Sequence, residues 1–133
     1  MAIDEKALEI KLREMLSTGG IVGVQFVWPN QQADESQPYA TVQYVPVRAN
    51  DDTIAGDDYG VDALLIVNLA TKIGTGTDFS LTFAEQVKAI FPLGTRIDLG
   101  SSMVEVQKHP ERKSSYRDGT SWRTPIQISI SAS

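Results

Sequence analysis

Hydrophobic residues recur at helical spacing after the stretch Gly74-Thr75-Gly76-Thr77-Asp78, and this stripe predicts the helix around which the chain is organised. Asp78 is expected to cap the helix start, although Thr82 and Glu85 form a second capping-box pattern one turn later. Pro92 is expected to end the helix, because proline lacks the amide that would donate the next helical hydrogen bond. The stripe consists of Phe79, Phe83, Ala84, Val87, Ile90 and Phe91.

Other segments show patterns typical of one more helix and several strands. Apolar residues at helical spacing predict a helix over residues 4–16, which Gly19-Gly20 ends. β-Branched and alternating residues predict strands over residues 21–28, 39–45, 61–70 and 121–131, and a hairpin that joins residues 96–99 to 103–107. The run over 61–70 is the most apolar, as expected of a central strand covered on both faces.

The last predicted strand alternates strictly between apolar and polar residues. One side carries Trp122, Thr124, Ile126, Ile128 and Ile130, and the other carries Gln127, Ser129 and Ser131. Pro125 predicts that this strand begins at an edge or at a bulge. The polar segments over residues 50–60 and 108–119 predict two long projecting loops.

The order of these elements predicts the fold class. Helices do not alternate regularly with strands, which favours an α+β fold with a mostly antiparallel sheet and two helices packed on one face. At 133 residues, the chain is expected to form a single domain over residues 1–133.

Composition narrows the possible functions. The chain has no cysteine, which excludes disulfides, thiolate metal sites and cysteine nucleophiles and fits an intracellular origin. The first residues carry acids rather than the bases of a secretory signal, and no segment approaches the ~20 apolar residues of a membrane span. The net charge of −5 argues against gripping DNA but not against a surface that DNA only passes.

Candidate catalytic, metal and cofactor sites are weak. His109 is the only histidine, so a solvated loop position is favoured over general acid–base chemistry. From Asp51 onward the EF-hand calcium pattern fails, because Thr53 and Ala55 stand at alternate positions and Asp62 at the twelfth. Gly74-Thr75-Gly76 lacks the lysine of a phosphate-binding loop. We therefore expect no catalytic residue, no metal site and no cofactor, and the serines have no local histidine as a base.

Two charged segments are the candidate interaction surfaces. The acidic one carries Asp51, Asp52, Asp57 and Asp58, and the basic one carries Lys108, Arg112, Lys113 and Arg117. Contact of the basic segment with nucleic acid and plain solvation of both segments are open alternatives. A further hypothesis is that the acidic segment of one copy contacts the basic segment of another.

The ordered set of motifs resembles the tail terminator (tail completion) family of long-tailed bacteriophages, of the minor tail protein U type. The matching features are a helix at the start, Trp28-Pro29-Asn30, a strand opened by Pro38-Tyr39, and Phe91-Pro92-Leu93-Gly94-Thr95 after the second helix. Asp118-Gly119-Thr120-Ser121-Trp122 then introduces the last strand. The resemblance spans nearly the whole chain.

The resemblance implies an α+β structural protein of the virion, with no catalytic residue. Such proteins form a hexameric ring on the end of the tail tube, stop tube polymerisation and dock the tail to the head–tail connector. DNA passes through the ring, and assembly takes place in the host cytoplasm. The alternatives are another neck or tail protein, either a connector or a tube subunit, and a small intracellular ligand-binding domain beside residues 74–78.

Overall fold

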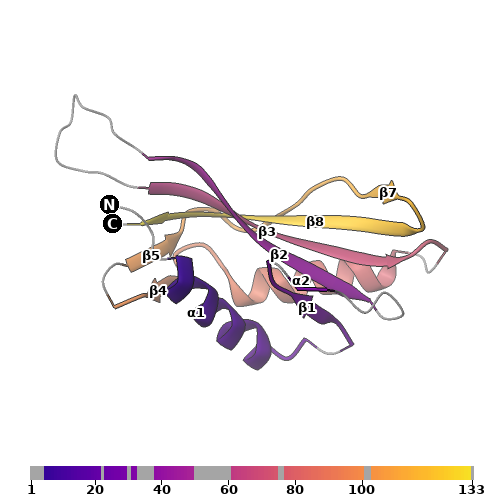
Figure 1. Cartoon of the computed structure of the whole chain (residues 1–133), viewed down its shortest axis with the longest axis horizontal. Helices are drawn as coiled ribbons and strands as arrows, with labels where there is room; N and C mark the ends of the chain where they lie inside the picture. Colours follow the sequence, from indigo (N-terminus) through magenta and orange to yellow (C-terminus); the bar gives the residue numbers. More distant parts are fainter. Residues whose placement is uncertain are drawn as a thin grey trace.

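Two helices and a large curled mixed sheet make up the computed structural model, which is an α+β arrangement (Figure 1). The structure describes residues 5–21, 23–29, 31–32, 38–49, 61–74, 77–100 and 103–132. The first half of the chain forms α1 (Glu5–Thr18), β1 (Gln25–Val27), β2 (Tyr39–Ala49), β3 (Val61–Lys72) and α2 (Asp78–Ile90). The second half forms β4 (Arg96–Asp98), β5 (Met103–Val106), β6 (Glu111–Arg112), β7 (Tyr116–Asp118) and β8 (Ser121–Ala132).

The strands lie in the order β1-β2-β3-β8-β5-β4, with β6 and β7 also paired to β8. β1 runs parallel to β2, and the other pairs are antiparallel. β3 pairs with β2 on one side and with β8 on the other, which confirms the predicted central strand. Its predicted cover on both faces is wrong in part, because Leu64 and Ile66 are only half-buried.

The larger of two buried hydrophobic clusters is shared by the two helices and the sheet. Alternate residues of β3 and β8 are buried, and residues paired across these strands lie on the same face. Both helices lie below the long strands in Figure 1. They contribute Leu8, Leu12, Leu16, Phe83, Ala84 and Val87, while β3 contributes Ala63, Leu65, Val67 and Leu69 and β8 contributes Ile126, Ile128 and Ile130. Each fully buried side chain of this kind stabilises the fold by roughly 1.5–3 kcal/mol.

The start of α2 differs from its prediction. Thr77 is the N-cap residue and makes no side-chain capping hydrogen bond, so Asp78 is the first helical residue rather than the cap. The Thr77 carbonyl accepts hydrogen bonds from the Leu81 amide and the Ser80 hydroxyl, each over 2.9 Å. Phe79 is 38% exposed, so it lies outside the buried stripe. The predicted end is confirmed, since the helix stops at Ile90 with Phe91 as its C-cap.

The segment over residues 108–119 was predicted as a projecting loop, and this prediction is wrong in part, because β6 (Glu111–Arg112) and β7 (Tyr116–Asp118) lie within it. β6 and β7 follow β5 along the outer edge of β8, so these segments together form one interrupted antiparallel neighbour of that strand. The Gln107 amide donates to Ser129 over 2.8 Å and bridges the first interruption. The polar composition hides this strand, because its stability comes from pairing with β8 rather than from burying its own side chains.

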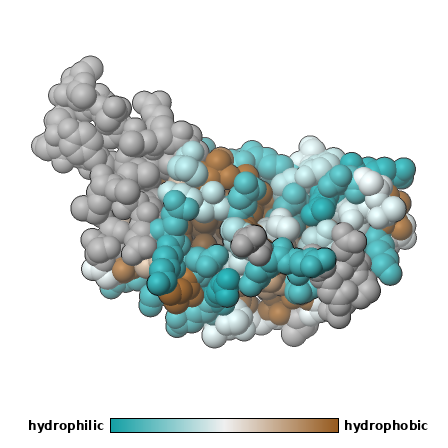
Figure 2. Space-filling view, in the orientation of Figure 1, coloured by the Kyte–Doolittle hydropathy of each residue, from teal (hydrophilic) through white to brown (hydrophobic). Residues whose placement is uncertain are grey.

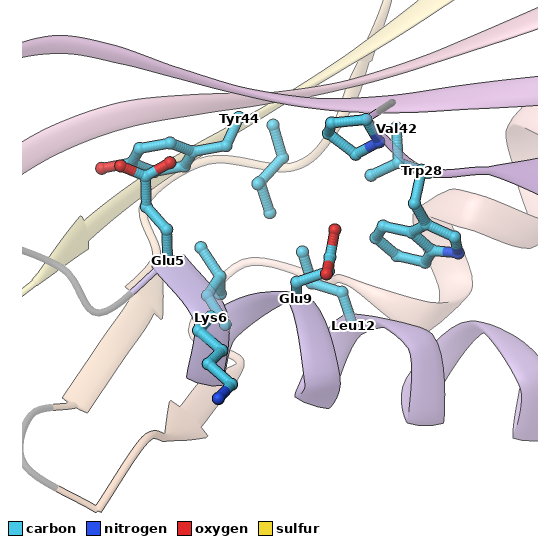
Figure 3. A pocket seen from close by; sticks show the side chains of 10 residues that line it. Glu5, Lys6, Glu9, Leu12, Trp28, Val42 and Tyr44 are labelled. Carbon is cyan, nitrogen blue, oxygen red and sulfur yellow. The ribbon is translucent and has the colours of Figure 1, made fainter. Parts of the chain in front are cut away.

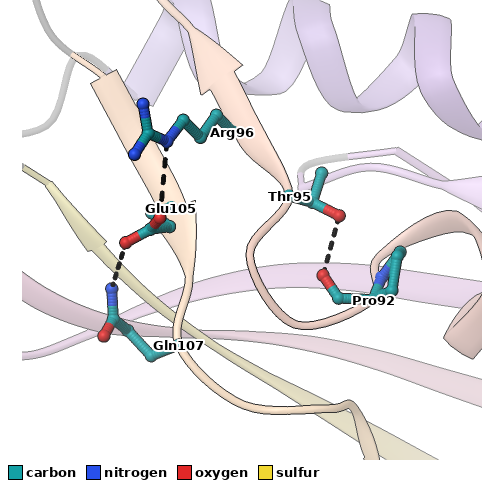
Figure 4. Close-up of polar contacts among 5 residues, drawn as sticks. All are labelled: Pro92, Thr95, Arg96, Glu105 and Gln107. Carbon is teal, nitrogen blue, oxygen red and sulfur yellow. Dashed lines mark hydrogen bonds and ion pairs between the residues drawn. The ribbon is translucent and has the colours of Figure 1, made fainter.

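The β4–β5 hairpin is confirmed, and polar side chains make contacts on it and at the turn before it (Figure 4). The Thr95 hydroxyl donates to the Pro92 carbonyl over 2.7 Å, which fixes the turn after α2. Across the hairpin, Arg96 Nε lies 3.4 Å from Glu105 Oε2. Along β5, Gln107 Nε2 donates to Glu105 Oε1 over 3.4 Å. These exposed contacts contribute little energy, about 0–1 kcal/mol each.

Candidate subunit interface

The structure places the predicted basic residues along the outer edge of β8. Lys108, Arg112, Lys113 and Arg117 are all exposed. Lys113 pairs with Glu111, with 3.2 Å between Nζ and Oε2. The predicted acidic residues Asp51, Asp52, Asp57 and Asp58 lie outside the described residues, so a contact between the two charged segments stays a prediction.

The basic side chains are divided between the two faces of the sheet. Arg112 is paired with Ile126, and Arg117 with Trp122, so both arginines are on the face of β8 that carries its buried core residues. Glu111 is paired with Gln127 and therefore points to the opposite face. Its ion partner Lys113, two residues on, is on that opposite face too. The edge thus offers arginines on one face and a lysine on the other.

Each side of the sheet has a stretch of backbone without a neighbouring strand in the described part of the chain. β1 pairs with β2 from Tyr39 to Thr41, and this parallel pairing also engages the Val42 amide, which leaves the outer side of β2 open beyond Val42. On the other side of the sheet, β6 and β7 pair with β8 alone. Open edges of this kind are templates for pairing with another chain.

A groove lies beside the open part of β2 (Figure 3). It has a volume of about 260 Å³ and separates the first half of α1 from the sheet. Its walls are apolar and consist of Leu8, Leu12, Trp28, Val42, Tyr44 and Leu65. Glu5, Lys6 and Glu9 of α1 stand at its rim (Figure 3). The groove therefore combines an apolar floor with a mainly acidic rim.

Charged side chains interact with aromatic side chains at both ends of this groove. Burial raises the pKa of the Tyr44 hydroxyl, and the nearby Glu5 carboxylate raises this pKa further. At the other end, the guanidinium carbon of Arg13 lies 5.0 Å from the centre of the Trp28 ring, a cation–π contact. Arg13 also lies 3.6 Å from the Glu9 carboxylate, one helical turn away.

Sequence reasoning missed this groove. Its walls come from α1, β2, β3 and the turn after β1, and only Trp28-Pro29 stood out in the sequence, as part of the family resemblance.

Figure 2 shows the hydrophobic residues of the face in view as small separate patches among hydrophilic ones. On that face, a contact with another chain would therefore depend more on polar and backbone groups than on one large apolar patch.

A second surface hollow, of about 430 Å³, lies at the β7–β8 turn and the end of β3. Beside it, Arg123 donates to the Tyr39 hydroxyl over 3.1 Å, and its guanidinium carbon lies 5.3 Å from the centre of the Tyr39 ring. Arg123 Nε lies 3.5 Å from the Asp118 carboxylate, and the arginine side chain is only 17% exposed. These contacts hold the β7–β8 turn against the start of β2.

The other sequence candidates lie apart from these surfaces. His109 is exposed, and its Nδ1 accepts a long, 3.5 Å hydrogen bond from the Leu93 amide. Gly74 has a φ of 95°, a left-handed conformation that suits glycine at the turn before α2. Among the described residues, no three histidine or acidic side chains gather as a metal site would require. The same residues contain no helix long and apolar enough to cross a membrane.

Comparison with known proteins places this fold in context. Residues 5–130 match the family model described as "Phage tail terminator protein". One solved structure has the same fold, with a TM-score of 0.70 and 17% sequence identity over 99% of this chain and 97% of the other. No curated protein has a significantly similar sequence.

Proposed function

Because the chain belongs to the phage tail terminator family, and is therefore a structural component of the virion tail, we propose that six copies form a ring that caps the tail tube. The ring stops polymerisation of the tube protein and presents the surface that docks to the head–tail connector. DNA passes through the ring without specific binding. The family match over residues 5–130 carries this proposal, because it spans nearly the whole described fold.

Two physical features support a ring. A cyclic assembly needs a heterologous interface, in which one surface of a copy meets a different surface of the next. Within the described residues, two unlike stretches of the sheet lack a neighbouring strand, one at β2 and one along β6 and β7. The net charge of −5 suits a channel that DNA traverses, since mild repulsion prevents the phosphates from sticking.

The test uses tail tubes assembled in cells infected by a phage that lacks this gene. Purified, gold-labelled protein is added to the tubes and its position is recorded by electron microscopy, with a gold-labelled unrelated acidic protein of similar size as control. We expect gold at one end of each tube and no further growth when tube protein is added. Gold along the whole tube would instead indicate a tube subunit, and gold on heads alone a connector. If the labelled protein binds neither tail tubes nor heads, a role in the neck is contradicted.

A further inference from the structure

We propose that neighbouring copies join edge to edge, with β6 of one copy lying against the open part of β2 in the next copy. In this interface Arg112 of the first copy reaches the acidic rim formed by Glu5 and Glu9 of the second. The proposal rests on the ring described above and identifies the two surfaces that build it. The partner is a second copy of this chain.

The backbone groups of the two edges face outward in the correct alternation. The Pro38 carbonyl accepts a hydrogen bond from the Gln25 amide over 3.1 Å, so even-numbered residues of β2 turn their backbone groups toward the outer side. Val42 is the last residue of β2 whose backbone pairs with β1. Beyond it, the next even-numbered residue of β2 with an amide is Tyr44. On the other edge, the Lys113 amide donates to Pro125 of β8 over 2.9 Å, which turns the backbone of Arg112 outward. Both edges therefore present donors and acceptors to a further strand.

The two edges also lie at the same level of the sheet. Strand pairing connects Val42 to Val67, Val67 to Ile126 and Ile126 to Arg112, which is one row across the whole sheet. The next row connects Gln43 to Ile66, Gln127 and Glu111. Tyr44 lies two residues beyond the row of Arg112, so pairing these two residues shifts one copy by roughly 7 Å along the strands of the next.

Side-chain direction brings complementary charges together. Val42 and Arg112 are on the same face of the sheet, because their row includes the buried core residues Val67 and Ile126. The groove with its acidic rim opens on that face, beside Val42. Arg112 of an adjoining copy would therefore approach Glu5 and Glu9.

Pairing of like edges is disfavoured by the same charges. Two β6 edges would bring two Arg112 side chains together, and two β2 edges would bring together two rims in which Glu5 and Glu9 outnumber Lys6. The contact is therefore heterologous, as a cyclic ring requires. A closed contact between two copies through identical edges would stop at a dimer.

Cysteine cross-linking tests the geometry, and the cysteine-free chain gives a clean background. Single variants Gln43→Cys and Val45→Cys mark one edge, and Glu111→Cys and Lys113→Cys mark the other; all four side chains are on the face opposite the helices. Each variant is oxidised alone and in equimolar mixture with a variant of the other edge, in solution and on tail tubes. We expect disulfide-linked dimers in at least one mixture and much less in every single variant. The proposal would be overturned if disulfide-linked dimers formed only from single variants oxidised alone. It would also be overturned if no mixture gave such dimers on tubes that the protein caps.

Charge reversal tests the role of Arg112. Arg112→Glu is expected to reduce cross-linked dimers about tenfold, and adding Glu5→Lys and Glu9→Lys to that variant is expected to restore most of them. Lys113→Glu changes the net charge equally but on the other face, so it should alter the yield by less than about twofold. Each variant is checked for an unchanged urea midpoint. Equal losses from Arg112→Glu and Lys113→Glu, without rescue, would show that net charge alone governs assembly.

The two proposals fail in different ways. If the protein caps tail tubes but gives no cross-link between the two edges, the ring is built from other surfaces and only this inference is wrong. If the edges cross-link in solution but the rings leave tube growth unchanged, the interface stands and the proposed function is wrong.

Discussion

The amide of Lys113 donates to the carbonyl of Pro125 over 2.9 Å, at the interruption between β6 and β7. Since the amide and carbonyl of one residue in a strand point to the same side, the missing donor of Pro125 faces this interruption and not β3. Pro125 lies in the middle of β8 rather than at its beginning. The irregularity that the proline predicts is therefore in the neighbouring edge.

This position makes Pro125 replaceable at low cost. Pro125→Ala is expected to lower the free energy of unfolding by roughly 0.4–1 kcal/mol, because only the restriction of the unfolded chain is lost. Gln127→Pro is the matched comparison, since the Gln127 backbone faces Glu111 of β6 and its amide would be lost from the ladder. Urea denaturation should show the larger loss for Gln127→Pro. The reverse ranking would mean that the Pro125 ring itself makes an important packing contact.

Arg123 is expected to act as a clamp on the β7–β8 turn. Tyr39→Phe removes the hydroxyl that Arg123 contacts and should cost about 0.5–1.5 kcal/mol. Tyr39→Leu also removes the aromatic face and should cost about 0.5–1 kcal/mol more. A double-mutant cycle with Arg123→Ala, followed by urea denaturation, measures the coupling. Additive losses would indicate that the two side chains do not interact energetically.

The ends of the two helices meet at Gly19. An added methyl group would collide with the Ile90 side chain and lie 3.1 Å from the Met15 carbonyl. Gly19→Ala is therefore expected to destabilise the fold by about 1–3 kcal/mol, as overpacking usually does. The double variant Gly19→Ala with Ile90→Val tests the cause by thermal unfolding, with Ile90→Val alone as control. A loss that persists unchanged in the double variant would indicate backbone strain instead of this collision.

Tyr44 lines the groove, so the pKa of its hydroxyl should report on the environment there. Its hydroxyl has a raised pKa, first from burial and then from Glu5, so the unfolded chain loses this proton at a lower pH than the folded chain. The resulting stability is fully present below the ordinary tyrosine pKa and is lost as the pH rises through the higher, folded pKa. Ultraviolet titration of the protein against Tyr44→Phe isolates this group. Glu5→Gln should lower the Tyr44 pKa part of the way, and an unchanged value would exclude the Glu5 contribution.

Local periodicity predicted much of the fold. The stripe of α2 and the alternation of β8 are repeated over several turns or residues, so single exceptions such as Phe79 did not hide them. Asp78 was assigned the wrong role because propensity favours acids at the cap, whereas the backbone begins the helix one residue earlier, after Thr77. β1 is three residues long rather than eight, because only its end reaches the start of β2.

Long-range pairing could not be predicted from composition. Glu111 and Arg112 have the composition of a solvated loop, and only pairing with the edge of β8 makes them a strand. The groove could not be predicted from the sequence either, because four separate segments bring its walls together. The charged residues of the basic segment are exposed, and their role at an interface stays a prediction; the division of their side chains between two faces depends on register, which the sequence does not show.

The pairing of β3 with β8 also has a consequence for how the molecule is made. Their partners are separated by roughly fifty to seventy residues, so the middle of the sheet closes only after β8 has been synthesised. Pairings this distant slow folding, because loop-closure entropy is lost before the contacts form. Until then the edge of β3 that pairs with β8 has no partner, and chains cut short before β8 should be degraded or aggregate. Completion of translation would thus act as a checkpoint that keeps partial subunits out of the virion.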